Sequence, residues 1–297
     1  MVEHRVHGRA DVGPLVAAMG RWDRDGVSVS GLSAGDVGWH LREPDQALDG
    51  TVHGWWQDDL LVAAALLEQG WSARPRLAPS HVRSFDVAEL VRESVESMTG
   101  EQVWCDADHG SALRQVLLRH GWEPDPDVWV ALHRDLPGRA PAYRVPGGVT
   151  VHRGADDVEG RVSAQRNGFE GSTFEVASWR RMAAGPGFRP ELDLVLRAYG
   201  VPAAGATAWL APEGGTAVLE PVAVHRDHRG RGLGRAVVEV AVAACRDSGA
   251  RGVSVCTPAS NTAAVAAYGS AGFHVMETLQ PVTRRRPGPA HQGIDAR

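Results

Sequence analysis

The sequence contains few cysteines and no long apolar run, and both absences narrow the class of protein. Cys105, Cys245 and Cys256 each lie in an apolar stretch without paired spacing, which predicts small core side chains rather than a disulfide framework or a zinc site. No segment has the roughly 18 consecutive apolar residues of a transmembrane helix, and residues 1–20 lack the apolar region of a signal peptide. We therefore expect a cytoplasmic protein in a reducing compartment.

The chain also lacks the basic surplus that is typical of nucleic-acid-binding proteins. Its formal net charge is -5 over 297 residues, and the arginines at 229–235 form only a local cluster. Such a cluster suits a small anionic ligand rather than a polyanion. We therefore predict no nucleic-acid partner and no membrane partner, and the sequence leaves open whether the protein is a monomer or a homodimer.

Two segments of the first half recur in the second half in the same order. Residues 6–12 resemble residues 151–158, and residues 103–122 align without gaps with the segment that starts at Val253. In the second pair, a cysteine ends an apolar strand-like run, and the helical stretch after it ends at a glycine and an aromatic residue. Two repeated segments that occur in the same order in both halves predict two copies of one α/β domain.

Proline, glycine and polar residues mark the boundaries of these two copies. Residues 137–148 contain three prolines and three glycines, which predicts a linker rather than a regular element. Residues 281–297 are polar and contain proline, glycine and arginine, which predicts a disordered tail. The first domain is therefore expected at 1–136 and the second at 149–280.

The second copy shows strand and helix patterns in a mixed order, typical of an α/β (α+β) domain with a mixed central sheet flanked by helices. Apolar residues recur at helical spacing after the strand that ends near Val224, for example at Val237, Ala241 and Cys245. Helices are expected at 157–167, 173–184, 232–248 and 261–271, and strands at 148–152, 193–198, 205–210, 216–224, 252–256 and 273–279.

A loop rich in glycine and arginine separates the strand at 216–224 from the next helix. Gly230, Gly232 and Gly234 permit close backbone approach, so the loop and the helix start can direct N–H groups at an anion. The neighbouring arginines supply positive charge for phosphates. A structural alternative is a glycine-rich turn that packs the helix on the strand. A dinucleotide site is disfavoured, because the alternate glycines do not fit the G-x-G-x-x-G pattern.

The spacing Arg229-x-x-Gly232-x-Gly234 resembles the acetyl-CoA pyrophosphate motif of the GNAT acetyltransferase superfamily. The resemblance covers roughly residues 148–280, and it covers 1–136 only as a degenerate copy, so it implies two tandem GNAT-like domains. The tandem arrangement is similar to that of mycothiol synthase-like actinobacterial acetyltransferases. The resemblance implies acetyl-CoA as a co-substrate, no metal, and the cofactor-binding residues Val222, Ala223, Val224, Arg229, Gly230, Arg231, Gly232, Leu233, Gly234, Arg235 and Asn261.

Three side chains are candidates for acid–base chemistry or for positioning the substrates. The resemblance implies that Tyr268 protonates the leaving thiolate and that Asn261 contacts the pantetheine arm or the tyrosine. The alternatives are a core aromatic and a helix cap. Glu220 lies within an apolar strand, where it could deprotonate the acceptor amine or form a structural salt bridge. Pro221 predicts a break or bulge beside it, which would free the backbone of residues 222–224 for the pantetheine arm.

The first copy lacks these groups at the aligned positions. It is therefore expected to be a scaffold that shapes the acceptor site or braces the second copy. The aligned residues are Gly110 for Asn261, Leu117 for Tyr268, Gln69 for Glu220, and Ala78, His81 and Arg83 for Arg229, Gly232 and Gly234.

Together, these features predict an N-acetyltransferase that transfers an acetyl group to a primary amine of a small molecule, directly within a ternary complex. The alternative is a non-catalytic module that binds CoA or acyl-CoA as a sensor or interaction protein. The mixed charges of residues 157–192, on the expected acceptor side, do not identify the acceptor.

Overall fold

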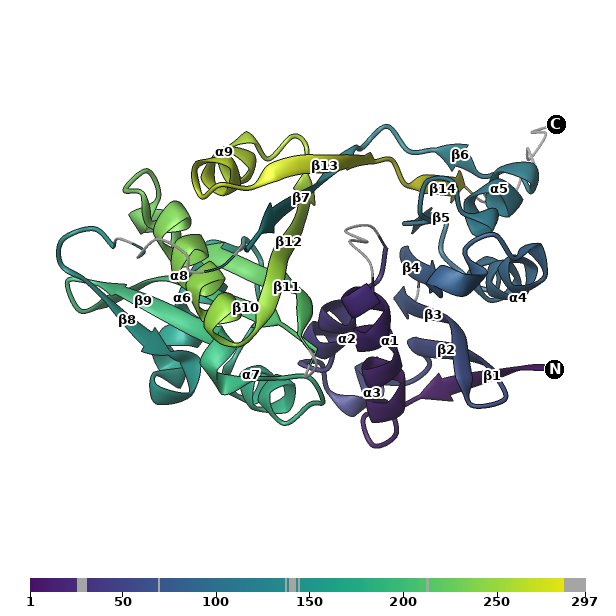
Figure 1. The fold of residues 1–297 in the computed structure, drawn as a ribbon, viewed down its shortest axis with the longest axis horizontal. Coiled ribbons are helices and arrows are strands. Elements are labelled where there is room, and N and C mark those ends of the chain that lie inside the picture. Colours follow the sequence, from purple (N-terminus) through teal and green to yellow (C-terminus); the bar gives the residue numbers. More distant parts are fainter. Residues whose placement is uncertain are drawn as a thin grey trace, which may run out of the picture.

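The computed structural model describes two halves, each built around a seven-stranded sheet with helices packed against it (Figure 1). The described residues are 1–25, 31–68, 70–136, 138, 143, 145–211 and 214–285. The first half contains β1 (Val2–His7), α1 (Gly13–Asp25), α2 (Ala34–His40), α3 (Asp45–Leu48), β2 (Val52–Gln57), β3 (Leu60–Glu68), β4 (Ser72–Leu77), α4 (Phe85–Glu96), β5 (Gln102–Cys105), α5 (Ala112–Arg119), β6 (Glu123–Pro124) and β7 (Trp129–Asp135).

The second half contains every helix and strand that its sequence predicts. Among the strands, the predicted and observed starts differ most for β10, which begins at Val201 rather than near residue 205. The elements are β8 (Val149–Arg153), α6 (Val158–Gly168), α7 (Val176–Ala183), β9 (Asp193–Ala198), β10 (Val201–Trp209), β11 (Gly215–Val224), α8 (Leu233–Asp247), β12 (Ala250–Pro258), α9 (Thr262–Ser270), β13 (His274–Leu279) and β14 (Val282–Arg285).

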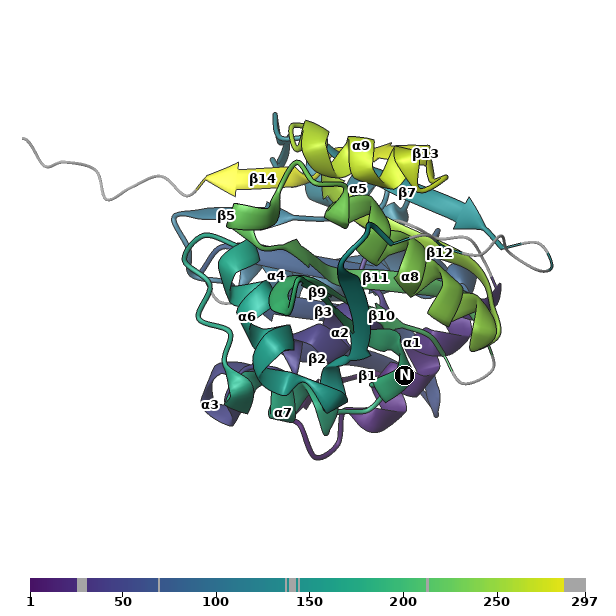
Figure 2. The ribbon, with the colours of Figure 1, turned by 90° about the vertical axis from the view of Figure 1, so that its left-hand side faces the viewer.

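The two halves exchange one strand each. The first sheet has the order β1-β2-β3-β4-β5-β14-β6, and the second has the order β8-β9-β10-β11-β12-β7-β13. Strand β14, near the end of the chain, therefore lies between β5 and β6, and β7 of the first half lies between β12 and β13. Figure 1 shows the two connecting segments crossing between the halves, and Figure 2 shows β14 beside β5 from the side. The shared strand order agrees with the predicted duplication.

This exchange corrects two predicted boundaries. Strand β7 falls within residues 1–136 but completes the second sheet, and residues 282–285, expected in a disordered tail, form β14. Residues 286–297 and parts of the predicted linker at 137–148 lie outside the described residues. The boundary at 136 failed because an apolar pattern shows that a strand is buried but does not show which sheet accepts it. The predicted tail failed at residues 282–285 because polar composition does not show that a segment pairs with a strand far away in the sequence.

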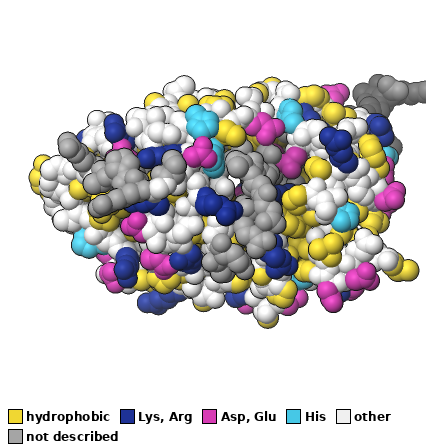
Figure 3. Space-filling view, viewed as in Figure 1, with side chains coloured by type: hydrophobic (Ala, Val, Ile, Leu, Met, Phe, Trp, Pro, Cys, Tyr) yellow, Lys and Arg dark blue, Asp and Glu magenta, His cyan; other side chains and the backbone are white. Residues whose placement is uncertain are grey.

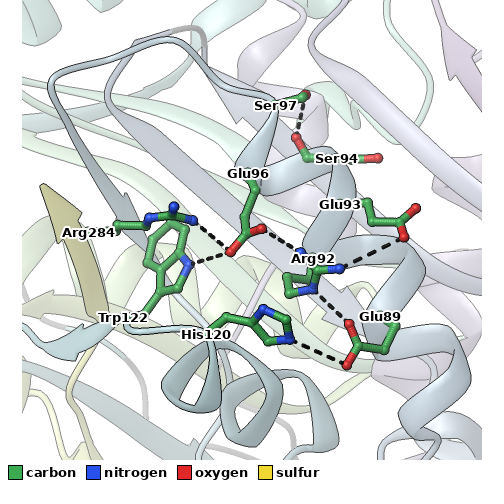
Figure 4. Close-up of polar contacts among 9 residues, drawn as sticks. All are labelled: Glu89, Arg92, Glu93, Ser94, Glu96, Ser97, His120, Trp122 and Arg284. Atoms are coloured by element: carbon green, nitrogen blue, oxygen red, sulfur yellow. Dashed lines mark hydrogen bonds and ion pairs between the residues drawn. The ribbon is translucent and has the colours of Figure 1, made fainter. Parts of the chain in front are cut away.

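Strand β14 is held in the first half by a buried side chain and by a polar cluster at the surface. Val282 is fully buried in the core that α4 and α5 form with the first sheet. Arg284 forms an ion pair with Glu96 of α4 at 2.7 Å. Arg92 also binds Glu96, and it binds Glu89 at 2.7 Å (Figure 4). Exposed ion pairs contribute little to stability, so we expect the burial of Val282 to dominate.

Replacing Val282 with aspartate is expected to destabilise the protein by at least about 3 kcal/mol, because it buries an unpaired carboxylate in the first core. Arg284→Ala should cost no more than about 1 kcal/mol, because the arginine side chain is 42% exposed. Urea denaturation of the two variants measures the difference in the free energy of unfolding. A loss for Arg284→Ala as large as that for Val282→Asp would contradict this prediction and show that the surface ion pair stabilises β14 as much as the buried side chain does.

The main core of the second half lies between α8 and the sheet. Val237, Ala241 and Cys245 of α8 are buried there, as their helical spacing predicts. Helices α6 and α7 form a separate apolar cluster with Trp209 of β10. Helix α8 is therefore anchored along its length, which fixes the position of the glycine-rich loop at its start.

The molecular surface carries charges of both signs. Figure 3 shows basic side chains interspersed with acidic ones on one face of the molecule. Within the described ranges, no helix is long and apolar enough to cross a membrane.

Candidate active site

A cavity of about 720 Å³ takes its walls from both halves of the chain. The second half contributes Glu220 of β11, Cys256 of β12 and Tyr268 of α9, and the first half contributes Asp36 of α2 and Arg74 of β4. The first half therefore forms part of the site, as the scaffold prediction allowed. Aromatic side chains also line the cavity, namely Trp39, Trp104, Trp129, Phe169 and Phe174.

Strand β11 is irregular where it borders this cavity. Its pairing with β10 shifts between Ala206–Val222 and Ala208–Leu219, so a single residue of β10 lies opposite both Glu220 and Pro221. This confirms the bulge predicted beside Pro221. In the described part of the chain, β11 pairs with β12 only over residues 215–218. The two strands then separate, which leaves the backbone of residues 222–224 without a strand partner on that side.

Helix α8 begins directly after the glycine- and arginine-rich loop. Gly230 and Gly232 have φ values of 73° and 75°, in the left-handed region that favours glycine. Gly232 is the N-cap residue, and among the described side chains none caps the first turn of α8. Free N–H groups at a helix start, together with the helix dipole, favour an anion at this position.

The three arginines of this loop have different surroundings. Arg229 donates to the carbonyl oxygen of Gly168 at 2.7 Å, which ties the loop to the end of α6. Arg235 pairs with Glu239, four residues further along α8, at 2.7 Å. Arg231 is exposed. Of the three, Arg231 can therefore turn toward a phosphate without first breaking a contact that the structure shows.

The corresponding helix of the first half, α4, has a capped start. Both halves have a 3-10 turn before this helix, at Pro79–His81 and at Arg226–His228, but in the first half the residues that follow the turn contain no glycine. The Ser84 hydroxyl oxygen accepts from the backbone N–H of Val87 at 3.4 Å. A capped first turn has fewer free donors for an anion. The geometry agrees with the absence of the loop motif from the first copy.

Two glycines let α2 approach the second half closely. A Cβ atom on Gly35 or Gly38 would lie 2.8 Å or 2.4 Å from the Trp209 side chain. Glycine within a helix costs about 1 kcal/mol relative to alanine, so close packing outweighs helix propensity here. The Trp209 Nε1 donates to the carbonyl oxygen of Glu220 at 2.6 Å. These contacts position Asp36 of α2 beside Glu220 of β11.

Asp36 and Glu220 are joined by a hydrogen bond between their side chains. Asp36 also accepts from the Ser33 backbone N–H, the Ser33 hydroxyl and Arg74, each at 2.6 Å. Burial raises the pKa of Asp36, but Arg74, Glu220 and Ser33 outweigh burial and hold this pKa below its usual value. Burial, the charge of Asp36 and the shared hydrogen bond raise the pKa of Glu220 well above its usual value. The pair therefore shares one proton, which resides on Glu220 beside an ionised Asp36.

Tyr268 and Asn261 reach the same cavity from α9. Tyr268 is 7% exposed, and burial together with Cys256 and Glu220 raises its pKa, so its hydroxyl is protonated at neutral pH. Asn261 is the N-cap of α9, and its side chain accepts from the N–H of Ala264 at 3.2 Å. The helix-cap interpretation of Asn261 is therefore correct, and the same residue also lines the cavity.

The expectation that all three cysteines are core residues is wrong for Cys256. Cys105 and Cys245 are buried, whereas Cys256 is exposed and lines the cavity. It lies in the part of β12 that has already separated from β11, so no neighbouring strand covers it on that side. Among the residues that the structure describes, no three His, Cys, Asp or Glu side chains are grouped so that they could hold a metal ion.

Sequence reasoning did not identify Asp36 and Arg74 as site residues. The spacing of Ser33 and Asp36 is that of a capping box, which the structure shows at the start of α2. Such a signal locates a helix start but does not show what lies opposite it in space.

The comparisons with known proteins agree with this geometry. Residues 167–273 match the Acetyltransferase (GNAT) family, and this segment includes β11, the loop, α8 and α9. Residues 167–273 are therefore similar to the GNAT acetyltransferase family, and the whole chain shares the fold of a tandem GNAT protein. A search of curated proteins found no match.

Solved structures resemble the chain over nearly its full length. A GCN5-related N-acetyltransferase from Sphaerobacter thermophilus is 21% identical, with 97% of each chain covered and a TM-score of 0.60. A tandem GNAT protein from the clavulanic acid biosynthesis pathway is 17% identical, with 97% of this chain and 100% of that chain covered and a TM-score of 0.61. At these identities the likeness shows the fold alone.

Proposed function

We propose that the protein is an acetyl-CoA-dependent N-acetyltransferase that acetylates a primary amine of a small molecule by direct transfer in a ternary complex. The observation that carries this proposal is the cavity that brings Glu220 and Tyr268 together beside the separated strands β11 and β12. Glu220 can accept a proton and Tyr268 can donate one, as amine acylation by a thioester requires.

Two features of the second half fit coenzyme A. The open start of α8 and the loop from Arg229 to Arg235 suit the pyrophosphate, because free N–H groups and positive charge meet there. The backbone of Val222, Ala223 and Val224 lacks a partner on the side of β12 and suits the amide groups of the pantetheine arm. Asn261, at the cavity wall, is proposed to contact the same arm.

The chemistry assigns one proton transfer to each side chain. Glu220 first releases to water the proton that it carries in the resting pair; the ionised carboxylate then takes a proton from the acceptor ammonium, and the free amine forms a C–N bond with the thioester carbonyl carbon. Tyr268 gives its hydroxyl proton to the departing thiolate as the C–S bond breaks. The second proton leaving the nitrogen restores the Tyr268 hydroxyl, and Glu220 releases its proton to water. General acid–base groups of this kind contribute roughly 10²- to 10⁴-fold each.

The test is thiol release from acetyl-CoA in the presence of a panel of small primary amines, with mass spectrometry of the products. The proposal expects thiol release that depends on an amine and yields its N-acetyl derivative. Binding of acetyl-CoA without thiol release for any amine would instead favour the non-catalytic CoA sensor.

We predict that one molecule of CoA binds per chain and that Gly232→Trp abolishes binding. The added indole would cover the first turn of α8, where space for a Cβ atom is open but φ is positive. The control is His81→Trp in the 3-10 turn that precedes α4 of the first copy, which should bind CoA normally. Isothermal titration calorimetry measures both, and two sites in the wild-type chain would contradict the assignment of CoA to the second half.

A further inference from the structure

The carboxylate of Asp36 is held more firmly than that of Glu220. It accepts two hydrogen bonds from Ser33 and one from Arg74, each at 2.6 Å, and its side chain is 12% exposed. Glu220 contributes the fourth hydrogen bond to Asp36. With three donors from the protein already directed at it, Asp36 is the acceptor of this fourth bond and Glu220 is the donor.

Other ionisable groups also face this pair, from every element packed around it. Their charges partly oppose one another, because Arg74 and Arg42 favour ionised Glu220 and Asp36 disfavours it. Uncharged Cys256 and Tyr268 complete the surroundings on the side of the second half. The charged groups are Arg42 after α2, Glu68 at the end of β3, Arg74 of β4, Asp106 after β5 and Asp36 itself.

We infer that the catalytic base is a two-carboxyl unit assembled from both halves of the chain, in which Asp36 of the first half controls when Glu220 can accept the proton of the acceptor amine. The inference rests on the proposed acetyl transfer. Asp36 is a positioning residue in this scheme, because it acts through Glu220 rather than on the substrate.

The role of Asp36 follows from the proton balance. When Glu220 takes a proton from the ammonium, an N–H bond breaks and an O–H bond forms on Glu220. Asp36 accepts the new O–H as a hydrogen bond and stays ionised, so the protonated product of this step is stabilised. A carboxyl group in water is a much weaker base than an alkylamine, and Asp36 reduces this mismatch for Glu220.

The first test is the pH dependence of kcat/KM for Asp36→Asn. Asparagine removes the negative charge and accepts fewer hydrogen bonds, so Glu220 ionises more easily. We expect the acid limb of the profile to move to lower pH by about 1 to 3 units. The plateau rate should fall as well, because the base is weaker. Asp45→Asn makes the same change at an exposed carboxylate that pairs with Arg9, and its acid limb should overlay the wild type.

A second variant separates this role from a purely structural one. Gly38→Ala keeps Asp36 but forces α2 away from Trp209, because the new Cβ would lie 2.4 Å from the ring. We expect a smaller shift of the acid limb in the same direction. Changes in kcat or in stability without any shift of the limb in either variant would overturn the inference.

An infrared measurement on the ligand-free protein tests the pair without any acceptor. At neutral pH the carbonyl band of a protonated carboxyl group should be present in the wild type. The part of this band that Glu220→Gln removes belongs to Glu220, whereas Asp106, whose pKa burial raises to about 7, contributes to the remainder. In the Asp36→Asn background, the part that Glu220→Gln removes should be smaller. A band unchanged by Asp36→Asn would overturn the inference. If the wild type acetylates no amine while these bands behave as expected, the proposed function fails and the carboxyl pair stands.

Discussion

Replacing Glu220 with glutamine is expected to lower kcat at neutral pH by about 10²- to 10⁴-fold, because the acceptor ammonium then has no base beside it. Part of the rate should return at high pH, where water already deprotonates the amine. The backbone contact from Trp209 to the carbonyl oxygen of residue 220 does not depend on the side chain, so the bulge should persist. Steady-state rates across pH, with the amine identified by the thiol-release panel, provide the measurement.

Glu220→Gln is also expected to make the ligand-free protein more stable than the wild type at pH values above the ordinary pKa of a glutamate. The pKa of Glu220 is raised in the folded state, so the folded protein binds more protons than the unfolded chain at pH values between about 4.3 and the raised pKa. Wild-type stability contributed by neutral Glu220 is therefore fully present below about pH 4.3 and is lost as the pH rises. Glutamine cannot ionise, so the difference in Tm should grow with pH.

One control variant and two contrary outcomes test the rate predicted for Glu220→Gln. Glu89→Gln changes an exposed carboxylate on α4, far from the cavity lining, and should leave the rate and its pH profile unchanged. A Glu220→Gln profile that overlays the wild type would show that Glu220 is structural. A rise in KM with an unchanged kcat would instead mean that Glu220 only binds the ammonium group.

Replacing Tyr268 with phenylalanine is expected to lower kcat by about 10²- to 10⁴-fold while leaving acetyl-CoA affinity unchanged. The ring is buried against Phe273 at a centroid distance of 5.8 Å, so phenylalanine preserves the packing and removes only the hydroxyl group. Because burial first, and then Cys256 and Glu220, raise the pKa of Tyr268, the hydroxyl carries its proton at neutral pH and can donate it.

The matched control is Tyr199→Phe, a tyrosine of the second half that is 83% exposed and does not line the cavity. It should retain wild-type turnover. Calorimetry with acetyl-CoA and steady-state kinetics separate binding from turnover for both variants. Wild-type turnover in Tyr268→Phe would remove this residue from the mechanism and leave the thiolate to be protonated by water.

The sequence by itself determined the local features of the second half. The helical spacing of Val237, Ala241 and Cys245 predicted α8, and the glycines before it predicted an open helix start, because both depend on residues that are neighbours in the chain. The two repeated anchors predicted the duplication that the shared strand order supports. Pro221 predicted the bulge in β11, because proline lacks the N–H that a regular ladder needs.

Only the tertiary structure decided which distant segments meet. Arg284 and Glu96 are 188 positions apart in the sequence, and nothing local to β14 shows that it joins the first sheet. The bond between Asp36 and Glu220 likewise depends on how closely α2 approaches Trp209, which two glycines permit but do not direct. Cys256 lies in an apolar run, and it is exposed because β12 leaves β11 just before it. Periodicity shows which face of an element is buried, whereas the partner of that face is fixed by packing between whole elements.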